Sequence, residues 1–181
     1  TWEGGIRVPF MMSYSKVIPK NTMIDVPLWS PDIFPTLCAL ADIAVPNKIA
    51  LDGQNIINIL QGKVKTHAPV FSMHNDEIMS VRKGDYKLFI NKPAFFNEED
   101  LSDWSDPRAP DSKTIIAQME GQSTPADYPG VIPKKSENKI QLFNLIEDPT
   151  ESNDISSSKP ELVEALTREY RGFKLSIEED Y

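Results

Sequence analysis

Cysteine is nearly absent from this sequence. Cys38 is the only one among 181 residues, and histidine occurs only twice. A single cysteine excludes a disulfide within the chain and a zinc site built from several cysteines. No run approaches 18 uncharged apolar residues, so no membrane-spanning helix is predicted. The sequence begins at Thr1 without a recognisable signal peptide, and we interpret it as the later part of a longer protein.

Basic residues are also scarce relative to acidic ones. Nineteen lysines and arginines stand against 27 aspartates and glutamates, which gives a formal net charge of −8. Nucleic acids and anionic membrane surfaces repel such a chain, so neither is expected as a partner. Hydrophobic residues still make up 40% of the sequence, which is enough for a core. The 15 prolines favour turns and rigid loops over a helical bundle.

Apolar residues recur with two different periods along the chain. Helical spacing predicts helices, and alternation of apolar and polar residues predicts strands. The predicted helices cover 30–44, 54–61 and a segment that begins at 158 and ends at Gly172. The predicted strands cover 8–14, 70–73, a hairpin over 79–90 with one apolar face, and 141–145. Together these elements indicate a mixed α/β fold.

Residues 95–130 differ from their surroundings. They contain eight acidic and two basic residues, which gives a local charge of −6. We favour a solvated insertion between two strands. The alternative is a loop that shapes a ligand cleft, because long loops in compact domains are often functional.

Few side chains suggest chemistry by themselves. Cys38 lies among apolar helix residues and is expected to be a small buried hydrophobe. Two histidines are too few for a zinc site, and His67 is expected at the surface. The polar cluster 74–77, His-Asn-Asp-Glu, is either a plain turn or the lining of a pocket for a polar ligand. Arg82 and Lys83 at the hairpin tip are solvated surface or, alternatively, an anion contact.

Five segments match motif patterns in a fixed order. Residues 1–10 read TWEGGIRVPF and fit T-x-E-G-G-x-R-x-P, and 30–37 read SPDIFPTL, close to S-x-D-L-x-P-T-L. The LDG at 51–53 fits a D-G segment without its proline. VRKGDYKL at 81–88 fits V-R-x-G-x-[WY]-K-L, and 142–153 fit L-[YF]-[DN]-L-x-x-D-P-x-E-x-x-N. Together these segments resemble the sulfatases, a branch of the alkaline phosphatase superfamily.

This resemblance implies a fold and an activity. Residues 1–65 would be the C-terminal part of an alkaline-phosphatase-like α/β catalytic domain. Residues 66–181 would form a small antiparallel β-sheet subdomain with a C-terminal helix. The intact protein would hydrolyse sulfate esters of a sulfated glycan or small molecule. A phosphodiesterase or phosphonate hydrolase of the same superfamily, and a non-catalytic substrate-binding module, are the alternatives.

The reactive groups that the resemblance implies are missing from this sequence. The sulfatase nucleophile is a formylglycine made in a [CS]-x-[PA]-[ST]-R motif, whereas Cys38 is followed by Ala-Leu-Ala. The calcium ligands and the sulfate-binding lysine would lie upstream of Thr1. We therefore expect no catalytic residue, metal ligand or bound cofactor in this chain, which should be inactive alone. Its expected partner is the N-terminal catalytic part of the same protein, and the resemblance implies a secreted or periplasmic location.

Two groups of residues are candidates for a functional site under this resemblance. Thr1, Glu3, Gly4 and Gly5 would follow the sulfate-binding lysine and support the active-site loop. Arg7 would brace that loop, for instance by a charge-assisted hydrogen bond to Glu3. The candidates for substrate contacts are His74, Asn75 and Asp76.

Overall fold

The computed structural model describes residues 2–45, 50–74, 76–91 and 140–179. The chain divides into two compact units, one made of Thr1–Ile90 with Ile140–Tyr181 and the other of Asn91–Lys139. Every helix and strand described below lies in the first unit. The acidic segment 95–130 and the predictions for it fall outside the described residues. The domain boundary predicted at residue 65 stays a prediction.

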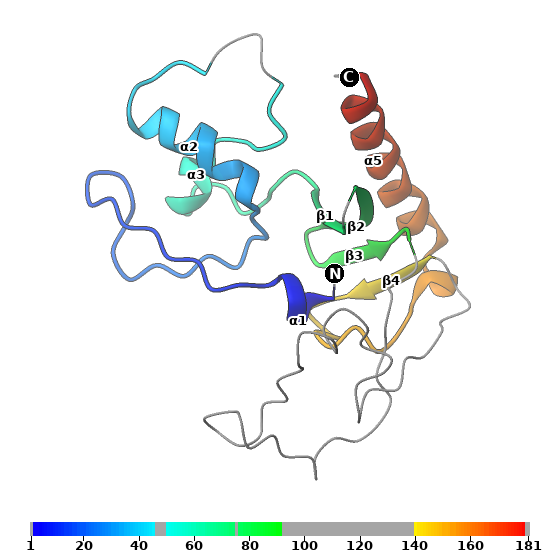
Figure 1. Ribbon diagram of the computed structural model, residues 1–181. Helices are drawn as coiled ribbons and strands as arrows, with labels where there is room; N and C mark the ends of the chain where they lie inside the picture. Colours follow the sequence, from blue (N-terminus) through cyan, green and yellow to red (C-terminus); the bar gives the residue numbers. More distant parts are fainter. Residues whose placement is uncertain (1, 46–49, 75, 92–139, 180–181) are drawn as a thin grey trace, which may run out of the picture. The chain divides into compact units, whose positions relative to one another are not determined.

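Four antiparallel strands form one sheet, and their order in the sheet follows the sequence (Figure 1). They are β1 Val70–His74, β2 Glu77–Lys83, β3 Tyr86–Phe89 and β4 Gln141–Asn144. The hairpin of β2 and β3 turns at Gly84, whose φ of 59° is a conformation that suits glycine. The last helix, α5, covers Pro160–Glu179. The predicted mixed α/β fold with an antiparallel sheet and a C-terminal helix is confirmed.

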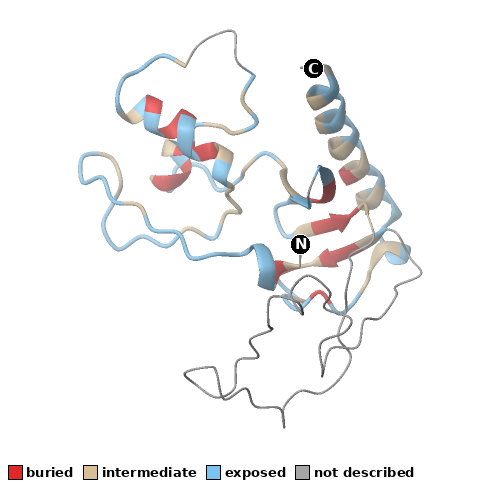
Figure 2. Ribbon diagram, viewed as in Figure 1, coloured by how far each residue is buried: buried red, intermediate tan, exposed pale blue. Residues whose placement is uncertain are grey.

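The main core lies between the sheet and α5. Val81, Leu88 and Leu142 project from three strands, are fully buried, and pack with Leu166 of the helix. Alternate residues of a strand point to opposite faces, so this set defines the face that α5 covers. Buried residues run along these strands in Figure 2.

The opposite face of the sheet is buried too. Phe89 and Phe143 are 0% and 1% exposed and form a second cluster. Trp2 covers them, with its ring centroid 4.7 Å from that of Phe89 and 6.0 Å from that of Phe143. The prediction of a hairpin with one apolar face is therefore wrong, because the first residues of the chain cover the face that was expected to meet solvent.

Two short helices occupy the places predicted for them. The 3-10 turn η1 Ser30–Asp32 leads into α2 Ile33–Leu40, and α3 spans Ile57–Leu60. Both α-helices are shorter than predicted. After α2 the backbone at Asp42 adopts a φ of 56°, which a right-handed helix does not allow. Cys38 is buried in α2, as expected.

The strand predicted over residues 8–14 is wrong. This segment has no strand conformation, and its Val8 and Met11 are 73% and 93% exposed. A strand is stable only when a neighbour takes its backbone hydrogen bonds. Such a neighbour is absent from the described residues, so apolar composition alone does not produce a strand here.

Helix α5 continues past Gly172, where the sequence predicts its end. Phe173 stacks on Phe71 of β1 with a centroid distance of 4.0 Å and an interplanar angle of 8°. Trp29 lies 5.9 Å from both rings. A glycine inside a helix costs only about 1 kcal/mol, and we attribute the extension to this aromatic packing.

Gly53 shows why the D-G pair is present. A Cβ added there would lie 2.1 Å from the carbonyl carbon of Pro31 and 2.5 Å from the nitrogen of Asp32. These are backbone atoms, which cannot swing aside as the end of a side chain can. Only glycine therefore lets the 51–53 segment lie against η1 in this way.

Substitution of two glycines should have opposite effects. Gly53→Ala should lower the free energy of unfolding by about 1–3 kcal/mol, because the new methyl group overlaps backbone. Gly172→Ala, with nothing within 4 Å of its added Cβ, should raise it by about 0.5–1 kcal/mol. Urea denaturation measures both values. A Gly53→Ala protein as stable as the wild type would contradict the contact.

Candidate functional site

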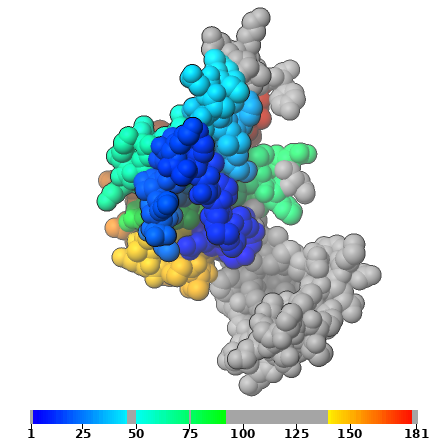
Figure 3. Space-filling view, turned by 90° about the vertical axis from the view of Figure 1, so that its left-hand side faces the viewer, coloured from blue at the N-terminus to red at the C-terminus, as the bar shows by residue number. Residues whose placement is uncertain are grey.

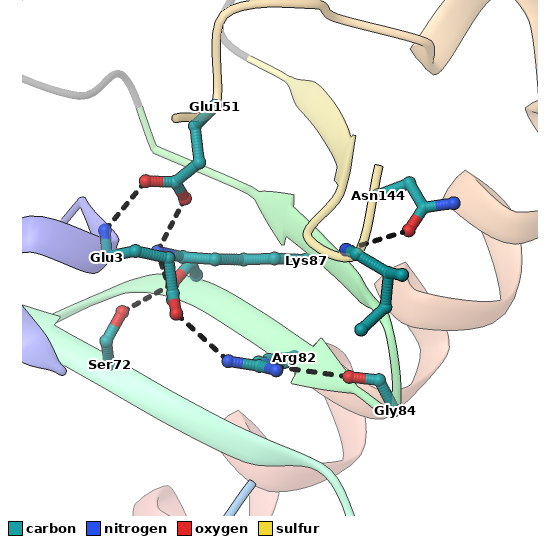
Figure 4. A network of polar contacts seen from close by, with 9 residues as sticks. Glu3, Ser72, Arg82, Gly84, Lys87, Asn144 and Glu151 are labelled. Atoms are coloured by element: carbon teal, nitrogen blue, oxygen red, sulfur yellow. Dashed lines mark hydrogen bonds and ion pairs between the residues drawn. The ribbon is translucent and has the colours of Figure 1, made fainter. Parts of the chain in front are cut away.

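Glu3 lies at the centre of a network of charges. It begins the four-residue helix α1 Glu3–Ile6 and is only 8% exposed. Its Oε2 accepts a hydrogen bond from Nη1 of Arg82 at 3.0 Å, and its Oε1 lies 3.2 Å from Nζ of Lys87 (Figure 4). Arg82 and Lys87 are opposite each other on β2 and β3. Two cations in that position repel each other, and the carboxylate of Glu3 offsets the repulsion.

Glu151 completes the network from the other side of Lys87. Its Oε1 lies 2.7 Å from Nζ of Lys87, and its Oε2 accepts a hydrogen bond from the backbone nitrogen of Glu3 at 2.7 Å. The side chains of Lys87 and Glu151 are 1% and 2% exposed. Two carboxylates and two cations give the cluster no net charge. Burial of a lysine is tolerable only with such pairing.

A tight turn holds Glu151 in place. The carboxylate of Asp148 accepts hydrogen bonds from the backbone nitrogens of Ser152 at 3.2 Å and Asn153 at 2.8 Å, and from the hydroxyl of Thr150 at 3.0 Å. Burial alone would raise the pKa of Asp148, but these hydrogen bonds outweigh it and the pKa is lowered. Glu151 lies inside this turn with a φ of 56°. Figure 3 shows the first residues, in dark blue, beside this yellow segment.

A second buried ion pair joins Asp32 and His67. His67 Nε2 lies 3.1 Å from Asp32 Oδ2, and both side chains are 1% exposed. Asp32 also accepts hydrogen bonds from the backbone nitrogens of Trp29 and Gln54, at 3.1 and 3.0 Å. The expected surface position of His67 is wrong. The sequence gives no sign that a carboxylate 35 positions earlier closes over the ring.

The surroundings of His67 favour its charged form. Its Nδ1 lies 2.7 Å from the carbonyl oxygen of Ala68, so both ring nitrogens face an acceptor, an arrangement that favours the doubly protonated ring. Burial by itself would lower the pKa of His67, but the hydrogen bonds to Asp32 and Ala68 raise it above the usual 6.5. For Asp32, burial alone would raise the pKa, but the hydrogen bonds from His67 and the backbone lower it below 3.8.

The predicted loop-support residues lie on or beside α1. Gly4, Gly5 and Arg7 are exposed, and Thr1 falls outside the described residues. The backbone nitrogen of Arg7 donates to the carbonyl oxygen of Glu3 at 2.9 Å. The predicted side-chain bond between Arg7 and Glu3 is not made, because Arg82 and Lys87 take the carboxylate of Glu3.

The predicted substrate contacts lie elsewhere on the sheet. His74 ends β1 opposite Glu77, and both His74 and Asp76 are exposed. Asn75 falls outside the described residues. Arg82 lies five residues beyond Glu77 on β2, about 16 Å at the rise of a strand. The structure therefore does not bring His74 and Asp76 to the network of Glu3.

The described residues do not fit the cofactors of the resemblance. Among them, no group of three or more His, Cys, Asp and Glu side chains is arranged to hold a metal ion. Cys38 is buried in α2 and lies outside a formylglycine motif. None of the helices among the described residues has the length and apolar character needed to cross a membrane.

The sequence pattern alone does not point to Lys87 or Glu151 as site residues, and it allows Arg82 to be either solvated or in contact with an anion. Arg82 does contact an anion, but that anion is the carboxylate of Glu3. A signal was available in the motifs. Three of the motifs include charged residues, namely Glu3, Arg82, Lys87 and Glu151. A charged residue specified within an otherwise apolar strand needs a buried partner.

Comparison with known proteins finds similarity to sulfatases. The chain is 28% identical to rat arylsulfatase G over 175 residues, which cover 93% of this chain and 28% of that protein. It is 38% identical to human steryl-sulfatase over 73 residues, which cover 40% of this chain and 12% of the relative. The chain thus spans less than a third of the length of these two relatives. No family model matches it.

Solved structures support the same fold. One has a title on the metabolism of multiple glycosaminoglycans by Bacteroides thetaiotaomicron. It matches with a TM-score of 0.51 and 23% identity, and the matched region covers 80% of this chain and 24% of the chain in that structure. A second, titled as the crystal structure of Ps i-CgsB, has a TM-score of 0.54 and 18% identity over 88% of this chain and 27% of its own. The chain is similar to sulfatases, as its motifs predict.

The Asp32–His67 pair should make stability depend on pH. The contribution of His67 is complete below pH 6.5 and is lost as the pH rises through its raised folded pKa. That of Asp32 is complete above pH 3.8 and is lost as the pH falls through its lowered folded pKa. His67→Ala should cost about 3–5 kcal/mol at pH 6, because it leaves a buried charge unpaired, and less at pH 9.

Urea denaturation at several pH values tests this expectation. His74→Ala is the matched control, because His74 is exposed. It should leave the free energy of unfolding nearly unchanged at both pH values. An equal penalty for His67→Ala at pH 6 and pH 9 would show that the pair contributes no charge-dependent stability.

Proposed function

We propose that the protein containing this chain hydrolyses sulfate esters. The observation that carries the proposal is the likeness to arylsulfatase G, which extends over 93% of the chain. The five motifs of this sequence, in their order, point the same way. Residues 1–65 would complete the alkaline-phosphatase-like catalytic domain, and residues 66–181 would form its small C-terminal subdomain. Secretion or a periplasmic location is proposed on the same resemblance.

The cations that neutralise the sulfate ester during hydrolysis would be groups other than Arg82 and Lys87. Hydrolysis of a sulfate ester builds negative charge on the sulfuryl oxygens, which cationic groups must neutralise. Arg82 and Lys87 already face the carboxylates of Glu3 and Glu151. We propose that a formylglycine nucleophile and a calcium ion come from the N-terminal catalytic part of the same protein. We assign neither cofactor to the described residues.

This chain would contribute support and substrate contacts. The predicted support residues Thr1, Glu3, Gly4, Gly5 and Arg7 would hold the active-site loop, with the sulfate-binding lysine directly before Thr1. His74, at the exposed end of β1, and the predicted contacts Asn75 and Asp76 would contact the organic part of the substrate. A sulfated glycan or small molecule is the proposed substrate. The relative with a title on glycosaminoglycan metabolism supports the glycan.

The activity is tested on the full-length protein that contains this sequence. We expect turnover of 4-nitrophenyl sulfate and slower turnover of bis(4-nitrophenyl) phosphate. A preference for the phosphodiester would indicate the related phosphodiesterases or phosphonate hydrolases, and no turnover of either would indicate a binding module. The 181-residue chain alone should be inactive. Its activity above background would overturn the placement of the nucleophile.

His74→Ala tests the proposed substrate contact. Loss of a hydrogen bond typically costs about 0.5–1.5 kcal/mol, so KM for sulfated glycosaminoglycan disaccharides should rise about two- to tenfold. Lys174→Ala, on the exposed part of α5, is the control and should leave KM unchanged. Equal kinetics for His74→Ala and wild type would remove His74 from the site.

A further inference from the structure

We propose that Lys87, Arg82 and Glu151 are positioning residues that act through Glu3 to fix the active-site loop. The inference rests on the proposed function and deepens it. It gives the small sheet a task in the reaction, namely to set where the turn of α1 lies.

Three motifs that are distant in sequence converge at Glu3. The backbone nitrogen of Glu3 bonds to Glu151, which is 148 residues away in sequence. Its carboxylate bonds to Lys87 and Arg82, which are 84 and 79 residues away. Each motif contributes at least one charge to the network, and the carboxylates and cations are equal in number. The three patterns are therefore parts of one contact.

The turn of α1 needs such a contact. A helix of four residues is unstable alone, because nucleation fixes several residues for one hydrogen bond. The backbone bonds of this turn are local, from Gly5 to Trp2 and from Arg7 to Glu3, each at 2.9 Å. Gly4 and Gly5 are exposed and add no packing, since a Cβ at either would meet nothing within 4 Å. Trp2 and Glu3 are therefore what ties the turn to the sheet.

The charges define this position more sharply than apolar packing does. Trp2 packs on aromatic rings, and such a contact tolerates sliding and tilting. The bonds to Glu3 instead fix both carboxylate oxygens and the backbone nitrogen. Replacement of a buried ion pair by apolar residues is often neutral or stabilising. The buried charges of this network thus fit a role in geometry better than a role in stability.

The test is a pair of double variants in the full-length enzyme. Lys87→Met with Glu151→Gln removes the central ion pair without leaving either of its two partners charged. Lys83→Met with Glu169→Gln removes an exposed Lys–Glu pair of 2.6 Å between β2 and α5 and is the matched control. For the first double variant we expect a fall in kcat of at least tenfold for 4-nitrophenyl sulfate. The control should keep the wild-type kcat.

A second readout separates positioning from general loss of structure. Hydrogen exchange of the amides of residues 3–7 should accelerate at least tenfold in the first double variant, while the amides of β2 and β3 stay protected. Lys87→Arg with Glu151 intact should recover most of the kcat. Wild-type kcat and unchanged exchange in the folded double variant would overturn the inference.

Two outcomes remain distinct from this one. If the first double variant does not fold, Glu3→Gln tests the inference instead. This variant leaves the Lys87–Glu151 pair in place and weakens the ionic contacts that hold the turn of α1. A wild-type kcat in Glu3→Gln would overturn the inference. If the wild-type enzyme itself turns over no sulfate ester, the proposed function fails, and exchange at residues 3–7 still reports whether the network positions the turn.

Discussion

The buried amine of Lys87 is the constraint on which the rest of the sheet depends. Its side chain is 1% exposed, and removal of an ammonium group from water costs several kcal/mol unless partners compensate. Those partners are Glu3 and Glu151, from opposite ends of the chain. The first turn, the hairpin and the turn after β4 must therefore be in place together, because the absence of either carboxylate leaves a charge buried with too few partners.

A similar arrangement organises the N-terminal half. Asp32 is 0% exposed and collects hydrogen bonds from Trp29, Gln54 and His67. Gly53 lies against the backbone beside it. In each half, one buried carboxylate holds together segments that are far apart in sequence. The five motifs thus reduce to two contact centres, one around Asp32 and one around Glu3. Each centre explains why the motif residues that form it are polar.

Periodicity predicted the elements well where both their ends and their partners are local. The β2–β3 hairpin needs only alternation and a turn residue, and Gly84 supplies the turn. Periodicity failed where burial depends on distant chain. Lys87 and Phe89 alternate with apolar residues, which predicts a solvated face, but Trp2, from the start of the chain, packs on Phe89 of that face. The chain from 8 to 14 has the apolar content of a strand and no strand pairing among the described residues.

The candidate site was predictable to the same extent. The motifs mark Glu3 as a support residue of the active-site loop, a role that stays a proposal, because a family pattern records which residues recur together. They could not tell which cation binds it, since Arg7, Arg82 and Lys87 are all cations of the patterns. Register decides. Arg82 and Lys87 are opposite each other on neighbouring strands, so they converge on one carboxylate. Arg7 leaves the turn on its exposed side. Glu3 thus fixes the turn from the inside, and Arg7 keeps its charge on the outside of the same turn.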